Sequence, residues 1–117
     1  MLTGDWVLVS PQRTKRPWQG SITPPVNEKL SRYDPQCYLC PGNLRADGKL
    51  NPDYTGTYLF SNDFPALLPE TELIESESPL FKIQPVSGIC RVLCFSERHD
   101  LTLPELELSA IENILHV

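Results

Sequence analysis

Twelve prolines among 117 residues constrain the fold of this chain more than any other feature of its sequence. Each proline removes a backbone donor and fixes φ, so that a proline in a helix interior or a central strand interrupts it. This share is about twice the usual one, which argues against a helical bundle. The sequence therefore predicts short strands joined by irregular connections, within one small domain spanning residues 1–117.

Hydrophobic patterns predict four strands and one helix. A helix is expected at the carboxyl end, where Ser109 and Glu112 have capping-box spacing and Ile111, Ile114 and Leu115 share one face. Long loops are expected at 12–25, which is basic and rich in proline, and at 69–79, which is acidic. The expected strands combine β-branched and aromatic residues or alternate apolar with polar ones, at 6–10, 57–61, 81–86 and 89–95.

The predicted helix reaches Val117 without a C-cap. Its apolar stripe has no following element in the sequence that would cover it. We therefore expect the sequence to be truncated at this end.

The charge and the amino terminus limit the classes of partner and the compartment. A net charge of -5 argues against general attraction to nucleic acid or to an anionic membrane surface. No run of apolar residues approaches the ~20 that a membrane-spanning helix needs. The amino terminus does not resemble a signal peptide, so a cytoplasmic location is expected. There, the four cysteines are expected to be thiols or metal ligands.

The motif Cys37-Tyr38-Leu39-Cys40 predicts a metal site. Two cysteines three positions apart in a turn can direct both sulfurs at one zinc ion, although a redox pair is an alternative. A third ligand must come from elsewhere in the chain, and His99, at the end of a predicted strand, is one candidate beside an ordinary surface histidine. The other candidates are Cys90 and Cys94, which we interpret as core residues, and His116, which we interpret as a solvated or packed side chain.

Two further groups of residues are suited to an anionic ligand. Basic side chains gather on the loop at 13–16, where guanidinium groups could bind phosphate oxygens, or could simply be solvated. Asn62 and Asp63 follow a predicted strand and could bind the paired hydroxyls of a ribose, or could form a strand-ending turn.

These motifs together resemble the galactose-1-phosphate uridylyltransferases. The resemblance begins with Leu2-Thr3-Gly4-Asp5-Trp6 and Arg13-Thr14-Lys15-Arg16-Pro17-Trp18, and continues through Cys37-Tyr38-Leu39-Cys40-Pro41-Gly42-Asn43. It extends over Asn51-Pro52-Asp53-Tyr54-Thr55-Gly56-Thr57, Phe60-Ser61-Asn62-Asp63-Phe64, Arg91-Val92-Leu93-Cys94-Phe95-Ser96, His99 and Leu103-Pro104-Glu105-Leu106. The ordered set covers nearly the whole chain.

The resemblance implies an α+β fold related to the histidine-triad proteins, with an antiparallel half-barrel sheet, a flanking helix and long irregular loops. Members exchange UMP between UDP-glucose and galactose 1-phosphate through a uridylyl-histidine intermediate. Matching positions imply that Cys37, Cys40 and His99 are three of four zinc ligands. The nucleotide-sugar contacts implied are Arg13, Thr14, Lys15 and Arg16, offered from the neighbouring subunit of a homodimer, and Ala46, Asn62 and Asp63 on the uridine side.

The sequence departs from the family at its catalytic segment. The His-X-His segment, which holds the fourth zinc ligand and the nucleophile, is absent, and residues before Leu2 also look clipped. We therefore expect the amino-terminal part of an enzyme, inactive alone. Two other hypotheses are a non-catalytic zinc or nucleotide-binding module and a small redox protein that uses Cys37 and Cys40.

Overall fold

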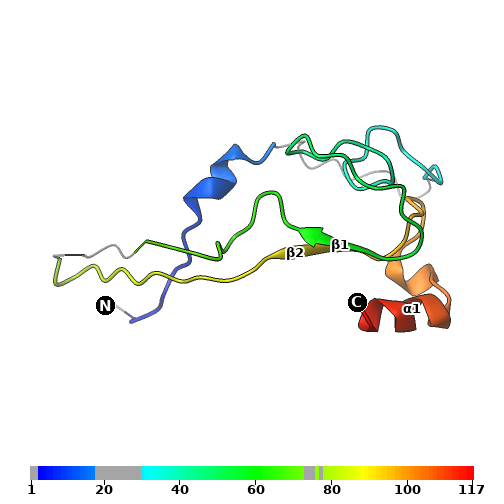
Figure 1. Cartoon of the computed structure of the whole chain (residues 1–117). Helices are drawn as coiled ribbons and strands as arrows, with labels where there is room; N and C mark the ends of the chain where they lie inside the picture. The colour runs from blue at the N-terminus through cyan, green and yellow to red at the C-terminus, as the bar shows by residue number, and fades with distance from the viewer. Residues whose placement is uncertain (1–2, 18–29, 73–75, 77) are drawn as a thin grey trace.

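The structure is a computed structural model of the chain and describes residues 3–17, 30–72, 76 and 78–117 (Figure 1). Two short strands form an antiparallel pair, and one α-helix follows them. This content agrees with the α+β class expected from the sequence. In chain order the elements are the 3-10 helix η1 (Pro11–Lys15), the strands β1 (Tyr58–Ser61) and β2 (Arg91–Cys94), the 3-10 helix η2 (Leu103–Glu105) and the helix α1 (Leu108–Leu115).

The pair β1–β2 confirms two of the predicted strands, each shorter than predicted. Tyr58 lies opposite Cys94 and Ser61 lies opposite Arg91. The two chain segments continue side by side beyond the pair, away from α1 (Figure 1), since Asn62 N donates to Cys90 O at 2.9 Å. This pairing fixes the position of the residues that follow β1 and of those that follow β2.

The predicted strands at 6–10 and 81–86 are wrong. Within the described ranges neither segment pairs with a ladder partner, and their apolar side chains are exposed, as for Val7 at 83% and Phe81 at 73%. A β-branched or aromatic run becomes a strand only where a neighbouring strand and a packed face are available.

The predicted loop at 12–25 is partly wrong, because Pro11–Lys15 forms η1. A proline in the first turn lacks only an N–H that would be unsatisfied there anyway, so Pro11 suits this start. Residues 18–25 of that loop lie outside the described residues. The predicted loop at 69–79 is confirmed for its described positions, which contain neither helix nor strand.

The helix was predicted correctly, but its cap was not. Glu107 is the N-cap of α1 and gives no side-chain cap, so that Ser109 lies inside the helix. The capping interaction lies one element earlier, where the Glu105 carboxylate accepts from Thr102 N at 2.8 Å and from Thr102 Oγ1 at 2.7 Å. Leu115, expected on the apolar face, is exposed.

The described part of the chain is extended and has a thin core. Its radius of gyration is 18.9 Å, whereas a compact domain of this length has about 13 Å. Only Cys40 and Cys94 are buried apolar residues, and Asn51 is the buried polar one, among the residues described. Cys94 was predicted as core correctly, while Cys90 is only half-buried.

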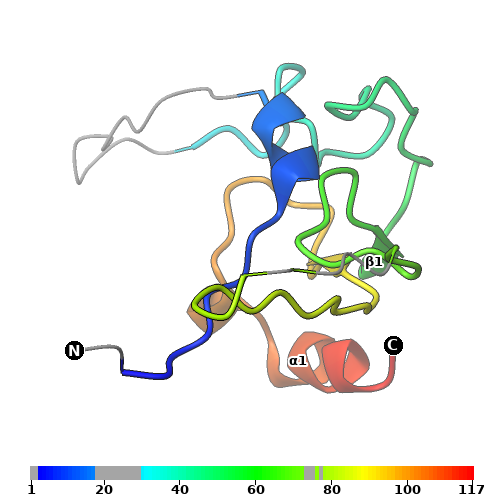
Figure 2. The same cartoon turned by 90° about the vertical axis from the view of Figure 1, so that its left-hand side faces the viewer.

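The loops of 30–56 lie on one side of the β1–β2 pair and α1 lies on the other (Figures 1 and 2). The site residues gather on the loop side. In the described ranges, no helix is both long enough and apolar enough to cross a membrane.

Candidate functional site

The structure brings together the three predicted metal ligands. One donor atom each from Cys37, Cys40 and His99 lie within 4.8 Å of one another, and Cys40 Sγ is 3.6 Å from His99 Nδ1. All four cysteines are free thiols. Two thiolates and an imidazole suit a borderline-soft cation, so the cluster can hold a metal ion. Cys90, Cys94 and His116, the other candidates, are not part of this cluster.

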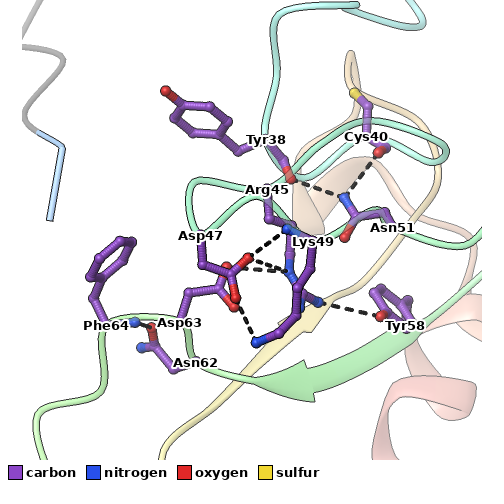
Figure 3. A network of polar contacts seen from close by, with 10 residues as sticks. All are labelled: Tyr38, Cys40, Arg45, Asp47, Lys49, Asn51, Tyr58, Asn62, Asp63 and Phe64. Carbon is purple, nitrogen blue, oxygen red and sulfur yellow. Dashed lines mark hydrogen bonds and ion pairs between the residues drawn. The ribbon is translucent and has the colours of Figure 1, made fainter.

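Backbone turns and one buried amide shape the segment between the cysteines. Cys37 N donates to Asp34 O at 3.1 Å, and Cys40 N donates to Cys37 O at 3.4 Å. The amide of Asn51, which is 1% exposed, donates to Tyr38 O at 2.9 Å and to Cys40 O at 3.1 Å (Figure 3). This side chain therefore fixes both ends of the short turn that carries the second sulfur.

A second amide and a phenol complete the support of this turn. Asn43 Nδ2 donates to Asp34 O and to Cys37 O, each at 2.9 Å. Tyr54 OH donates to Leu39 O at 2.7 Å, and burial raises the pKa of Tyr54, which keeps the phenol a neutral donor. The sequence alone indicates no role for these side chains, although Pro41-Gly42-Asn43 and Asn51-Pro52 are turn sequences that could have suggested one.

His99 is held beside the turn by the chain that precedes Cys37. Its backbone N donates to Arg32 O at 3.0 Å. Its Nε2 lies 3.9 Å from Asp34 Oδ2, and the other oxygen of Asp34 accepts from Gln36 N at 2.8 Å. A carboxylate that faces the second ring nitrogen is the usual support of a metal-ligating histidine.

The environment of Cys40 favours the neutral thiol when no cation is present. Burial raises the pKa of Cys40, the neighbouring Cys37 thiol adds to the rise, and the Asp34 backbone opposes it. A bound divalent cation reverses this balance, because it stabilises the thiolate directly. The raised pKa therefore argues against a free reactive thiolate at Cys40.

A cavity of about 700 Å³ adjoins the metal cluster. Cys37 and His99 lie in its wall, together with aromatic side chains such as Phe60 and Phe64. It thus joins the cysteine turn, β1 and the residues that follow β1. Four of the seven predicted substrate-binding residues also line it, namely Arg16, Ala46, Asn62 and Asp63, whereas Arg13, Thr14 and Lys15 do not.

Side-chain hydrogen bonds from η1 and its N-cap place Arg16 at this cavity. Ser10 Oγ donates to Ala66 O at 2.6 Å, and Gln12 Nε2 donates to Pro65 O at 3.2 Å. These bonds attach the start of η1 to the loop that follows β1. Thr14, one of the predicted contacts, donates instead to Pro11 O within its own turn at 2.8 Å.

Asn62 and Asp63 differ in their surroundings. Asn62 Oδ1 accepts from Phe64 N at 2.9 Å, which is the turn-forming role considered for it from the sequence. Asp63 instead lies beside a cation that no sequence motif indicates, since its Oδ2 is 3.2 Å from Arg45 Nε (Figure 3). Burial raises the pKa of Asp63, and Arg45 opposes that rise.

Comparison with known proteins identifies relatives along the whole chain. The galactose-1-phosphate uridyl transferase N-terminal domain family matches residues 1–117. Proteins named galactose-1-phosphate uridylyltransferase are 50% identical over 99% of this chain in Haemophilus influenzae and 48% identical over 97% in Cryptococcus neoformans. The Rattus norvegicus protein of that name is 45% identical over 97%. The chain covers 34%, 31% and 30% of these relatives, so it spans about a third of their length.

Proposed function

Because this chain belongs to the galactose-1-phosphate uridyl transferase family, we propose that it provides a zinc site and part of a uridine-nucleotide pocket. The enzyme proposed exchanges UMP between UDP-glucose and galactose 1-phosphate in galactose metabolism. One observation supports this most strongly: a single cavity is lined by the Cys37 and His99 side chains and by Arg16 and Asp63.

The metal in this proposal is zinc, held by Cys37, Cys40 and His99. The donor set supports zinc, because two thiolates and one imidazole match its usual ligands. Zinc, when bound, supplies no redox chemistry and acts as a link between distant segments. Here it would join the cysteine turn to the segment after β2, while Asp34 orients His99.

The remaining chemistry is divided between recognition and transfer. Arg16 would neutralise a phosphate of the nucleotide sugar, while Asn62 and Asp63 would meet the ribose and Ala46 would border the uracil. The sequence has no His-X-His segment, so the proposal assigns the uridylyl-accepting histidine and a fourth zinc ligand to residues outside it. The chain alone is then inactive in transfer.

The proposal extends to the assembly and the compartment. In a homodimer, Arg13, Thr14 and Lys15 would reach the nucleotide sugar of the neighbouring subunit. Their position outside the cavity and the exposed apolar side chains of Trp6 and Val9 are compatible with a second copy covering this region. The β1–β2 pair would belong to a half-barrel sheet of the histidine-triad type, and the free thiols suit the cytoplasm.

Nucleotide binding by the zinc-loaded chain tests this proposal. We expect isothermal titration calorimetry to detect UMP and UDP-glucose, and expect Asp63→Ala to weaken both by about tenfold or more, since a charged hydrogen-bond acceptor is lost. Asp53→Ala, which changes an exposed carboxylate outside the cavity, is the matched control. A folded, zinc-loaded chain that binds no uridine nucleotide would refute the proposal, as would equal losses in both variants.

A further inference from the structure

Arg45 is an almost buried cation that points at the pocket carboxylate. Its side chain and that of Asp63 are each 9% exposed, and Nε lies 3.2 Å from Asp63 Oδ2. A second carboxylate oxygen, Asp47 Oδ1, is 3.7 Å from the same nitrogen. Nε makes no aligned hydrogen bond, so the attraction between Arg45 and Asp63 is an ion pair in a region of reduced solvent screening.

Aromatic residues of β1 fix the orientation of this guanidinium. The centre of the guanidinium lies 4.3 Å from the centroid of the Phe60 ring, and Nη1 donates to Tyr58 OH at 3.5 Å. Tyr58 itself stacks on Phe60, with ring centroids 5.4 Å apart. A cation held on an aromatic surface of a paired strand keeps its direction better than one on a free loop.

Asp63 has one oxygen committed and one free. Oδ2 faces Arg45, whereas Oδ1 is buried and has no hydrogen-bond partner. The residue lines the cavity beside Asn62 (Figure 3). A buried carboxylate oxygen without a partner is costly, and a bound hydroxyl group would remove that cost.

Building on the proposed function, we propose that Arg45 is a positioning residue that holds Asp63 with Oδ1 free to accept the ribose hydroxyls. Arg45 also lines the cavity, but in this role it acts on the nucleotide through Asp63. It enables the carboxylate to distinguish a ribonucleotide from its 2′-deoxy analogue, because the 2′-hydroxyl is the group that is absent from the analogue.

The charges around Asp63 give this role a pH signature. Arg45 and Lys49 favour the carboxylate, whereas Asp47 and burial oppose it, and the balance leaves the pKa of Asp63 raised. Loss of the Arg45 charge raises that pKa further, so that Asp63 becomes protonated at a higher pH in the variant than in wild type. The carboxylate accepts hydrogen bonds more strongly than the carboxylic acid does. The preference for a ribonucleotide over its 2′-deoxy analogue should therefore fall as the pH is lowered, and in a variant without the Arg45 charge it should fall at a higher pH than in wild type.

The test compares the binding of UMP with that of 2′-deoxy-UMP between about pH 5 and pH 8. We expect the zinc-loaded wild-type chain to prefer UMP by about tenfold or more, and expect Arg45→Met to reduce this ratio to below about threefold. The Arg45→Met midpoint of the pH profile should move upward. Arg45→Lys should restore part of the ratio, and Arg91→Met, which removes an exposed arginine of β2, should leave it unchanged.

The outcomes separate this inference from the function on which it rests. If wild type binds neither nucleotide, the proposed function fails. If wild type prefers UMP, and Arg45→Met weakens both nucleotides equally with an unchanged pH profile, Arg45 is only structural and the inference is overturned. Should Arg45→Met not fold, the carboxyl ¹³C titration of Asp63 in Arg45→Gln decides: an upward shift from wild type supports the role, and an unchanged titration overturns it.

Discussion

Asn51 supports the cysteine turn through its side chain. It is buried, and its amide donates to two carbonyl groups between Tyr38 and Cys40. We expect Asn51→Ala to reduce the free energy of unfolding by about 1–3 kcal/mol, because buried carbonyls lose their donors. Urea unfolding of the zinc-loaded protein measures this.

The matched control for Asn51 is Asn113→Ala, on the exposed side of α1. Its unfolding free energy should stay within about 0.5 kcal/mol of wild type. An Asn51→Ala protein that is as stable as this control would contradict the role assigned to the buried amide.

The lowered pKa of Asp47 predicts that the stability of the folded chain depends on pH in the acidic range. Hydrogen bonds from Lys49 lower the pKa of Asp47 from 3.8 to about 2. A carboxylate with a lowered pKa in the folded state stabilises that state above 3.8, and this contribution is lost as the pH falls to about 2. Asp47→Asn should therefore flatten the dependence of the melting temperature on pH in this window.

The control for Asp47 is Asp5→Asn, an exposed carboxylate near the amino terminus. Thermal melts are recorded at several pH values within that window. The slope of melting temperature against pH should equal that of wild type in Asp5→Asn and should be smaller in Asp47→Asn. Equal slopes in all three proteins would show that Lys49 does not act on Asp47 in the folded chain.

Residues with distinctive chemistry could be predicted from the sequence, whereas residues whose roles depend on burial and on distant partners could not. Cys37 and Cys40 could be predicted as ligands because the spacing of a Cys-x-x-Cys motif lets both sulfurs bind one metal ion. Arg45 and Asn51 could not, because their roles depend on burial and on partners that only the folded chain brings near. The pairing of Arg45 with Asp63 spans a strand and a turn, and no local pattern encodes it.

At the scale of elements, the strands β1 and β2 formed where two of the predicted strands pair with each other. The segments at 57–61 and 89–95 contain β1 and β2, while those at 6–10 and 81–86 have similar composition but no ladder partner among the described residues. Composition indicates that a segment suits a sheet. It does not indicate which other segment will lie beside it.

The entry to β1 depends on Gly56, which has φ +72°. Its N–H donates to Glu97 Oε2 at 2.8 Å, which connects the start of β1 to the segment after β2. We expect Gly56→Ala to cost about 1–2 kcal/mol, since a residue with Cβ is strained at this φ. Thr55→Ala, at the exposed neighbouring position, should cost less than half as much by urea unfolding. Equal costs would contradict the assigned strain.

At the scale of the whole molecule, we expect metal binding to compensate for the thin core of the described residues. The two buried apolar residues of the described ranges cannot supply much hydrophobic stabilisation, so the free energy of metal binding should become free energy of folding. We expect a chelator to lower the melting temperature sharply or to abolish the cooperative transition, as followed by circular dichroism. Re-addition of zinc should restore the transition. A melt that a chelator leaves unchanged would contradict this dependence.

The extent of this core could not be predicted from composition. An apolar content of 40% is that of an ordinary globular domain, yet large apolar side chains such as Trp6, Phe81 and Leu108 are exposed. Composition reports how much apolar surface a chain carries. It does not report whether this chain, a second copy or another segment covers that surface.

The zinc content of the purified chain, measured by elemental analysis, tests the proposed metal site. We predict one zinc per chain in wild type and in Cys90→Ser, which changes a half-buried thiol outside the cluster, and loss of zinc in Cys37→Ser, Cys40→Ser and His99→Ala. A folded wild-type chain without zinc, or zinc that remains after all three single substitutions, would contradict the assigned metal site.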